Sequence, residues 1–552
     1  MITNNLKTGL FFKSLYVLFL FVLLSPHSEA QVVYEPTWKS SYDFLSRLAQ
    51  RGIIELDDVI QPISRETIQT KLDELYQRKS DLTPLEKQEL DFYLKDYAFD
   101  RYTFDTLKKT NAFKSFFGIK EGDRFRWISL HKDDFSVNLQ PLIGASLDIR
   151  NGETVFQRNS GFWLYGYVKK RFGYSFSFNE ANESGPFVDR TKEFTPVTGF
   201  VGTRKGESVQ YSDFRTNLSY NWSWGSISAG RDHVLWGYGT QGRLVSSDKA
   251  PAYPFVRLEV NPAPWLGFHM SNISLNSMVA DSSTLRSTKW TSDQIDYVQK
   301  NLATHSFILK PFKGFSFAIG ESIIYNNRLK LGYLIPLSFF RAQSHYEGET
   351  SGKTNTISNS QFFLQFSSRN HVPNTHVYFS FFVDEMSFRK FFSQEEMRNQ
   401  TGYTGGVSVT NFPLKNMYFL SEYTRTRPYS YQHFIPAQTY TNNNYNLGHW
   451  IGSNADQWIS RVKYRVSRGF TAEASLALVR KGSVPTDSTF MQNERGTPFL
   501  WGEVLNQKNF MASLQYELMH DLFLRSSWQW TTLSGRLEED YQTLNLALRY
   551  GF

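Results

Sequence analysis

The chain has 552 residues, of which 16% are aromatic and none is cysteine, and it carries a formal net charge of +8. The lack of cysteine excludes disulfides, thiol catalysis and cysteine-ligated zinc. The basic residues are scattered and form no block, so the composition gives little support for nucleic-acid binding, and no nucleic-acid partner is predicted.

The N-terminus has the three parts of a secretory signal. Lys7 and Lys13 precede an apolar run, residues 15–24, which is followed by Ser28-Glu29-Ala30. We therefore predict that residues 1–30 are a signal peptide, cleaved after about Ala30. The alternative is an uncleaved anchor, although the run is short for a membrane-spanning helix.

Residues 31–115 predict a small helical unit. One short helix begins near Ser41 and ends near Gly52, and Ser64 can cap a second helix with one apolar face. The sequence Thr83-Pro84-Leu85-Glu86 is a capping box that opens a third helix. This unit is interpreted either as a plug or periplasmic contact module, or as packing support for the next domain.

From about Phe135 to the C-terminus, apolar residues recur at every second position. In the last stretch, one face carries Leu544, Leu546, Leu548, Tyr550 and Phe552. The other face is mostly polar, and aromatic residues such as Trp528 and Trp530 end the apolar face of the preceding stretch. This pattern is typical of transmembrane barrels with aromatic girdles, whereas alternation alone also fits a secreted soluble β-protein.

The turns between these stretches are short on one side and long on the other, as in outer-membrane barrels. Tight turns occur at 311–314, 413–416, 467–469 and 519–521, and long polar excursions at 183–210, 238–253, 280–302, 344–358, 428–455 and 483–507. We predict that residues 125–552 form an all-β transmembrane antiparallel barrel of roughly 16–18 strands. Its expected partners are the lipids of a Gram-negative outer membrane and the barrel-insertion machinery, which would recognise the last strand ending in Phe552.

A glycine motif follows one of the predicted strands. Gly237, Gly239 and Gly242 have the spacing of a dinucleotide-binding fingerprint, which needs a helix directly after the glycines. The residues that follow, 243–254, contain two prolines and no helical period, so the Rossmann interpretation fails. The glycines instead predict a structural loop with positive φ angles at a barrel mouth or beside lumenal residues.

Motifs around this loop resemble the Wzi-type capsule assembly proteins. They are Gly230-Arg231-Asp232, Trp236-Gly237-x-Gly239, Leu244-x-Ser246-Ser247, Glu422-Tyr423-x-Arg425-Thr426-Arg427-Pro428, Leu447-Gly448-His449 and the N-terminal Phe44-Leu45-x-Arg47-Leu48. The resemblance extends over residues 37–552. It implies an outer-membrane barrel, closed by a helical unit, that binds capsular or exopolysaccharide at the cell surface.

Sugar binding needs flat aromatic side chains for pyranose faces and charged or amide groups for hydroxyls, with arginine for anionic sugars. Such residues gather at 423–456 and in the glycine loop. The candidate ligand-binding residues are Arg425, Arg427, Tyr429, Tyr431, His433, His449, Trp450, Asp456, Trp236, Tyr238 and Arg243. The alternative is that many of them line the lumen or form the aromatic girdle.

No catalytic motif such as GxSxG or HExxH occurs, and His371 and His376 flank a Pro-Asn turn where solvated residues are expected. We predict no enzyme activity, no cofactor and no metal, although a hydrolytic site built from distant loops is an alternative. The predicted function is to attach or assemble polysaccharide at the cell surface. The competing hypothesis is an outer-membrane transport channel for a solute or polymer, which would need an open lumen.

Overall fold

The computed structural model describes most of the chain. The described residues are 33–97, 124–132, 135–169, 171–287, 293–326, 328–351, 358–385, 400–483 and 497–552. The predicted signal peptide and residues 98–115 of the predicted helical unit lie outside them.

Eighteen long antiparallel strands form a closed barrel. They are β3 (Phe135–Arg150), β4 (Glu153–Val168), β5 (Phe172–Ser184), β7 (Ser208–Trp222), β8 (Gly225–Asp232), β10 (Tyr253–Ala263), β11 (Leu266–Ala280), β12 (Tyr297–Leu309), β13 (Phe315–Asn326), β14 (Asn359–Arg369), β15 (Thr375–Glu385), β16 (Gln400–Thr410), β17 (Met417–Thr426), β20 (Ala455–Arg465), β21 (Phe470–Lys481), β22 (Leu505–Met519), β23 (Leu522–Gly535) and β24 (Glu539–Tyr550). The predicted barrel and its strand number are confirmed.

The ring closes where β24 pairs with β3, with Tyr550 opposite Ile143. Two short strands extend it: β2 (Ile128–Lys132) pairs with the start of β3, and β6 (Gly202–Lys205) pairs with β7. Closure leaves the sheet without an edge, which is the condition for a sheet to cross lipid because every backbone group must find a partner.

Successive side chains of each strand point alternately to the outside of the barrel and to its lumen. Leu544, Leu546 and Leu548 are exposed on the outside, whereas Ala547 between them is buried on the lumenal side. The outer wall is therefore the apolar face that a lipid-spanning barrel requires. Among the described residues, none of the helices combines the length and the apolarity that crossing a bilayer demands.

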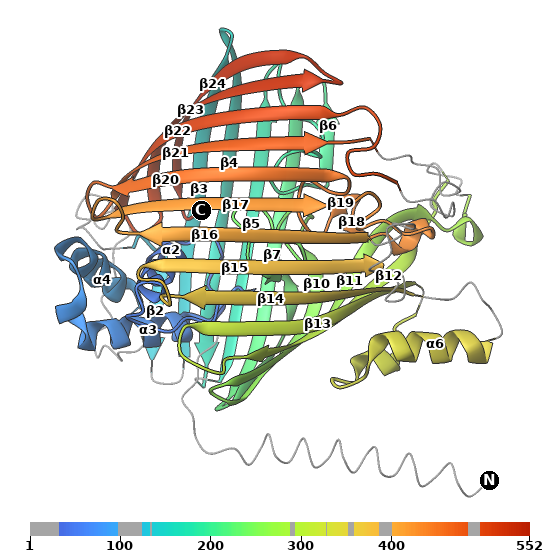
Figure 1. The fold of residues 1–552 in the computed structure, drawn as a ribbon, viewed down its shortest axis with the longest axis horizontal. Helices are drawn as coiled ribbons and strands as arrows, with labels where there is room; N and C mark the ends of the chain where they lie inside the picture. Colours follow the sequence, from blue (N-terminus) through green and yellow to red (C-terminus); the bar gives the residue numbers. More distant parts are fainter. Residues whose placement is uncertain are drawn as a thin grey trace, which may run out of the picture.

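The two ends of the barrel differ, as Figure 1 shows. One end carries tight turns, such as that between Met519 and Leu522, and the blue helices α2 (Ser40–Gln50), α3 (Arg65–Gln77) and α4 (Pro84–Tyr97). The other end carries the long loops and helix α6 (Phe340–Ser351). Two tight turns, Arg150 to Glu153 and Gly535 to Glu539, also lie at the long-loop end, so the asymmetry is less strict than predicted.

The helices begin where the sequence places their caps. The Ser64 hydroxyl accepts the amide hydrogen of Thr67 at 3.0 Å and opens α3. At α4 both hydrogen bonds of the capping box form. Thr83 N–H donates to the Glu86 carboxylate at 2.8 Å, and Glu86 N–H donates to the Thr83 hydroxyl at 3.3 Å. The apolar faces of the helices then pack into one core, which includes the fully buried Leu45, Leu48, Ile68, Leu72, Leu75 and Leu90.

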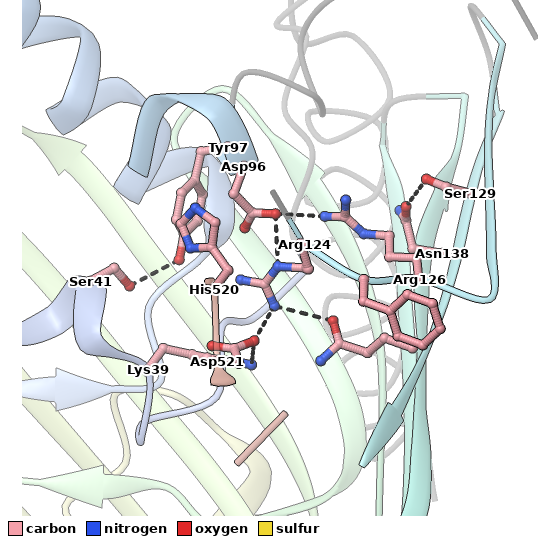
Figure 2. A network of polar contacts seen from close by, with 12 residues as sticks. Lys39, Ser41, Asp96, Tyr97, Arg124, Arg126, Ser129, Asn138, His520 and Asp521 are labelled. Atoms are coloured by element: carbon pink, nitrogen blue, oxygen red, sulfur yellow. Dashed lines mark hydrogen bonds and ion pairs between the residues drawn. The ribbon is translucent and has the colours of Figure 1, made fainter. Parts of the chain in front are cut away.

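Buried ion pairs fasten this helical unit to the short-turn end of the barrel (Figure 2). Asp96, in the last turn of α4, accepts from Arg124 Nε and Arg126 Nη2, each at 2.7 Å. Asp521, in the turn between β22 and β23, binds Lys39 Nζ at 2.5 Å and also pairs with Arg124. The unit therefore lies across the short-turn end, where both strands and helices contribute to one charge network.

We expect Asp96→Asn to weaken this network, because Arg124 and Arg126 would be left buried beside a neutral amide. Removing one partner of a buried ion pair costs about 3–5 kcal/mol. Burial alone raises the pKa of the Asp96 carboxyl, but the neighbouring arginines lower that pKa well below its usual value. The stabilisation is therefore present above about pH 4 and is lost as pH falls below it. The measurement is the free energy of unfolding in urea, in detergent micelles at pH 7.

Asp91→Asn is the matched control, because it breaks the exposed pair with Lys79 in the same unit. An exposed pair contributes little to stability, so this variant should unfold like the unmodified protein. Equal losses in the two variants would contradict the assignment of Asp96.

Candidate functional site

The segment that joins α2 to α3 enters the barrel. Arginines on the lumenal wall contact it there. Arg369 in β14 forms an ion pair with Asp58 at 2.8 Å. The guanidinium of Arg257 in β10 donates to the carbonyl oxygen of Pro62 at 3.3 Å. Both arginines are buried, and each has a carboxylate partner, because Arg257 also pairs with Glu259 in its own strand.

Inside the lumen this segment pairs with the glycine loop. Strand β1 (Ile60–Gln61) runs antiparallel to β9 (Leu235–Trp236), and Gly237 N–H donates to the carbonyl oxygen of Val59 at 2.8 Å. Trp236 is only 1% exposed in this position. The loop that follows β8 is thus part of the packing inside the barrel.

The three glycines allow the loop to fold tightly. Gly237 has φ 100° and Gly242 has φ 155°, both in the region that favours glycine. Gly239 lacks a positive φ, unlike the prediction, but a Cβ atom there would lie 1.9 Å from the carbonyl oxygen of Gly242. Glycine is needed at position 239 because two parts of the loop backbone approach each other closely there.

Wall residues hold the tip of the loop. Thr240 N–H donates to the Glu422 carboxylate at 2.9 Å, and the hydroxyl of Tyr378 donates to the same carboxylate. Gln457 Nε2 donates to Gln241 Oε1 at 2.6 Å. Glu422 is not among the predicted site residues, although the alternation of β17 places its side chain on the lumenal face.

A second long loop, residues 427–454, packs directly on the glycine loop. The hydroxyl of Tyr431 donates to the carbonyl oxygen of Leu244 at 2.8 Å, and that of Tyr440 donates to the carbonyl oxygen of Val245 at 2.8 Å. The two tyrosine rings lie 5.7 Å apart between their centroids. These two loops therefore form one folded unit.

A third loop, residues 185–201, covers them. The hydroxyl of Tyr445 donates to the carbonyl oxygen of Thr191 at 2.7 Å, and the rings of Phe194 and Trp450 lie 5.1 Å apart. Lys249 Nζ donates to a carbonyl of this loop at 2.9 Å, and burial lowers the pKa of Lys249 to about 8. Residues 185–201, 237–252 and 427–454 are called the loop cap below.

Most of the predicted ligand-binding aromatics are buried in the loop cap or, in the case of Trp236, in β9 directly before it. Trp236, Tyr238, Tyr429, Tyr431, His449 and Trp450 are each less than 9% exposed. A sugar ring stacks on an exposed aromatic face, so in this conformation these side chains pack the cap. Their role in binding stays a prediction.

Arg425 and Asp456 lie on the outer face of the wall, because they alternate with the inward-facing residues of β17 and β20. Asp456 accepts from the hydroxyl of Tyr423 at 2.8 Å and from Arg480 Nε at 3.0 Å. The guanidinium of Arg425 lies 3.7 Å from the ring centroid of Phe499. The barrel wall therefore separates these two residues from the buried aromatics.

The remaining three predicted residues are partly exposed. Arg427 and His433 belong to the loop cap, and burial lowers the pKa of His433 to about 4. Burial also lowers the pKa of Arg243, and the negative charge of Asp58 partly offsets this effect. Arg243 therefore faces the segment between α2 and α3, to which Asp58 belongs. All three residues belong to the loop cap, and Arg427 and His433 lie in its second loop, residues 427–454.

The histidines offer no metal site among the described residues, where no group of three or more metal-ligating side chains occurs. His376 is buried in β15 beside Ser367 Oγ at 2.8 Å, so the expectation that it is a solvated turn residue is wrong. His449 is 0% exposed, its Nδ1 accepts from Ile451 N–H at 3.4 Å, and burial lowers its pKa to about 3.

Comparison with known proteins agrees with this architecture. The family model described as "Capsule assembly protein Wzi" matches residues 151–543, which is more than half of the chain. The chain belongs to this family. A comparison with curated proteins finds no match.

Among solved structures, the chain is similar to Escherichia coli Wzi, an outer-membrane protein described as a carbohydrate-binding β-barrel involved in group 1 capsule assembly. The identity is 11%, the TM-score is 0.57, and the match covers 95% of this chain and 100% of the other. Pseudomonas aeruginosa OccD3 (OpdP) matches at 10% identity and a TM-score of 0.43, over 77% of this chain and 92% of its own. P. aeruginosa OprD matches at 11% and 0.41, over 78% and 98%.

The likeness to the E. coli protein establishes the fold, and the TM-scores of the two Pseudomonas proteins are too low to carry an argument. The family and the barrel together place this protein in the outer membrane of a Gram-negative bacterium. The short-turn end with its helices is then periplasmic, and the loop cap is extracellular.

Gly239→Ala should displace the glycine loop, because the added methyl group would overlap the carbonyl oxygen of Gly242. We expect ions to pass the barrel more readily once the loop is displaced, and single-channel conductance in planar bilayers measures this directly. Gly405→Ala is the control, since its Cβ would make only an ordinary contact at 3.8 Å with Phe379. A Gly239→Ala barrel as silent as the control would show that this loop is not needed for closure.

His449 should make the stability of the protein depend on pH. Because the pKa of His449 falls from its ordinary 6.5 to about 3 in the folded protein, the unfolded state binds more protons between these values. Stability is complete above about pH 6.5 and decreases as pH falls, by roughly 2 kcal/mol at pH 5. We expect His449→Asn to reduce the difference in unfolding free energy between pH 7.5 and pH 5 by this amount, whereas a change at the exposed His371, His371→Asn, should not alter it.

Proposed function

We propose that the protein is a non-enzymatic polysaccharide-binding protein that helps to attach or assemble capsular or exopolysaccharide at the cell surface. The observation that carries this proposal is the loop cap, in which three long loops are bonded to one another and to the wall. Such a cap presents a fixed surface on the extracellular side. Membership of a capsule assembly family supports the same conclusion.

The lumenal packing weighs against a transport channel. The pair of β1 with β9 crosses the lumen, and Glu422 and Gln457 fasten the loop tip to the opposite side of the wall. A solute would have to displace these bonded segments together. Conductance of the unmodified protein in planar bilayers would revive the channel hypothesis.

We propose that polysaccharide contacts the exposed surface of the loop cap and the short strand beside it. Phe434 is 45% exposed and its ring lies 4.2 Å from the ring of His433, so the two offer an aromatic surface to a sugar. Arg190 on the loop 185–201 and Arg204 in β6 are exposed and suit carboxylate or phosphate groups of an anionic polymer. Arg427 belongs to the same loop as Phe434.

Two further proposals concern the export of the protein and its insertion into the membrane. We infer that the signal peptide is cleaved after about Ala30 and that the insertion machinery recognises the last strand through Phe552. In the folded barrel Phe552 packs beside the buried cluster that contains Leu142 and Trp163. We further propose that no cofactor takes part and that no reaction is catalysed.

The test is a clean deletion strain in which polysaccharide is measured separately on washed cells and in the medium. We expect polymer to move from the cells to the medium while the total amount stays constant. Re-expression of Phe434→Ala combined with Arg190→Ala should restore less cell-bound polymer than the unmodified gene, because both changes remove exposed contacts without disturbing the packed core.

Leu285→Ala is the matched control, as Leu285 is 58% exposed on a different extracellular loop. It should restore retention fully, and equal amounts of each variant in the outer membrane must be checked. A deletion that leaves both fractions unchanged would contradict the proposed function for that polymer.

A further inference from the structure

The described part of the loop between β13 and β14, residues 328–351, lies apart from the loop cap. The yellow helix α6 lies outside the ring of strands, next to β13 (Figure 1). The outer face can be identified from Arg257, which points into the lumen and pairs in register with Ser271 and, through it, with Thr304. Residues one position away from these, including His305 and Glu321, therefore face outward.

The first residues of α6 cover a polar pair in the outer wall. His305 Nε2 lies 3.2 Å from Glu321 Oε1, about halfway along β13. Phe340 N–H donates to the same carboxylate oxygen at 2.8 Å, and its ring lies 4.3 Å from the His305 ring. His305 is 8% exposed and Glu321 4% exposed. Ionisable groups on the lipid face of a barrel are costly at this height, so their cover has a physical reason.

The other side of this cover is apolar and points away from the barrel. Leu331 is 75% exposed, Leu337 76% and Phe339 56%, and Leu334 and Ile335 are exposed beside them. A surface of this kind in water favours aggregation, but here it adjoins the apolar outer wall of a membrane barrel.

The charges of this segment have one sign. Residues 328–346 contain Arg328, Lys330 and Arg341 and no acidic residue, and the two glutamates of α6, Glu347 and Glu349, follow only in its C-terminal half. The Lys330 ammonium lies 5.6 Å from the ring centroid of Tyr333, and the Arg341 guanidinium lies 5.9 Å from that of Phe362. Apolar side chains combined with basic side chains are the pattern of a segment that lies in a membrane interface with anionic lipids.

We propose that residues 328–346 are an interfacial membrane element that binds an anionic lipid of the outer leaflet. Leu331, Leu337 and Phe339 lie among its acyl chains, and Lys330 and Arg341 bind its headgroup phosphate. The lipid site is on the outer wall and independent of the loop cap, so it does not depend on polysaccharide binding.

The first test uses the absence of cysteine from the chain, which permits single-site spin labelling of the full protein. A nitroxide at Leu337→Cys, in phosphatidylcholine vesicles containing lipid A, is compared with labels at Leu364→Cys on the outer wall and Val372→Cys in a periplasmic turn. We expect label 337 to match label 364, with high access to oxygen and low access to a water-soluble nickel complex. Access to nickel equal to that of label 372 would overturn the proposal.

The second test addresses the headgroup. The purified protein in non-ionic detergent is titrated with lipid A, and bound lipid is counted by native mass spectrometry. Lys330→Gln combined with Arg341→Gln should weaken binding by about thirty-fold, as expected for two basic residues at an anionic lipid. The control, Lys205→Gln with Arg286→Gln, changes exposed basic residues on other loops and should bind normally. Unchanged binding in the first variant, equal loss in both, or equal binding of inorganic phosphate would overturn the lipid site.

Discussion

The antiparallel pairing of Ile60 with Trp236 is the contact on which the packing inside the lumen depends. It joins a segment from the periplasmic helices to the loop that enters from the extracellular side. Backbone groups in a confined space need partners, and this pairing supplies them for both segments. The glycine loop then offers its carbonyl groups to Tyr431 and Tyr440, which bring the second loop into place.

The same requirement explains where the ionisable residues lie. Inside the barrel, Arg257 and Arg369 are buried, and each finds a partner on the entering segment. Outside it, the His305–Glu321 pair faces the membrane and is covered by Phe340. In both places a segment that folds onto the barrel wall supplies hydrogen-bond or ion-pair partners for the ionisable residues of the wall.

Local patterns in the sequence predicted the elements well, because each depends on neighbouring residues. The caps at Ser64 and at Thr83 with Glu86 marked where two helices begin, and the period of two marked the strands. The alternation could also have assigned Arg425 to the outer face, since it lies one position from Thr424, which is buried on the lumenal side.

Local sequence patterns could not predict whether the aromatic residues of the loops are buried or exposed. Tyr431 donates to a carbonyl group of Leu244, and this contact joins positions that are 187 residues apart. A loop rich in tyrosine, tryptophan and histidine has the same composition whether it binds sugar or packs against another loop. Only the partner surface distinguishes the two cases, and for Trp450 that surface includes Phe194, which comes from a third loop.

A fixed cap of this kind suits the retention of a polymer better than its passage. Because the three loops are bonded to each other and, through the β1–β9 pair, to the periplasmic helices, opening the lumen would break many contacts at once. Retention needs no such movement. A polysaccharide repeats its unit along its length, so many copies of a barrel can hold one chain through contacts that are each weak. The binding surface proposed around Phe434 then needs only modest affinity at each contact, and the buried aromatics pack beneath it.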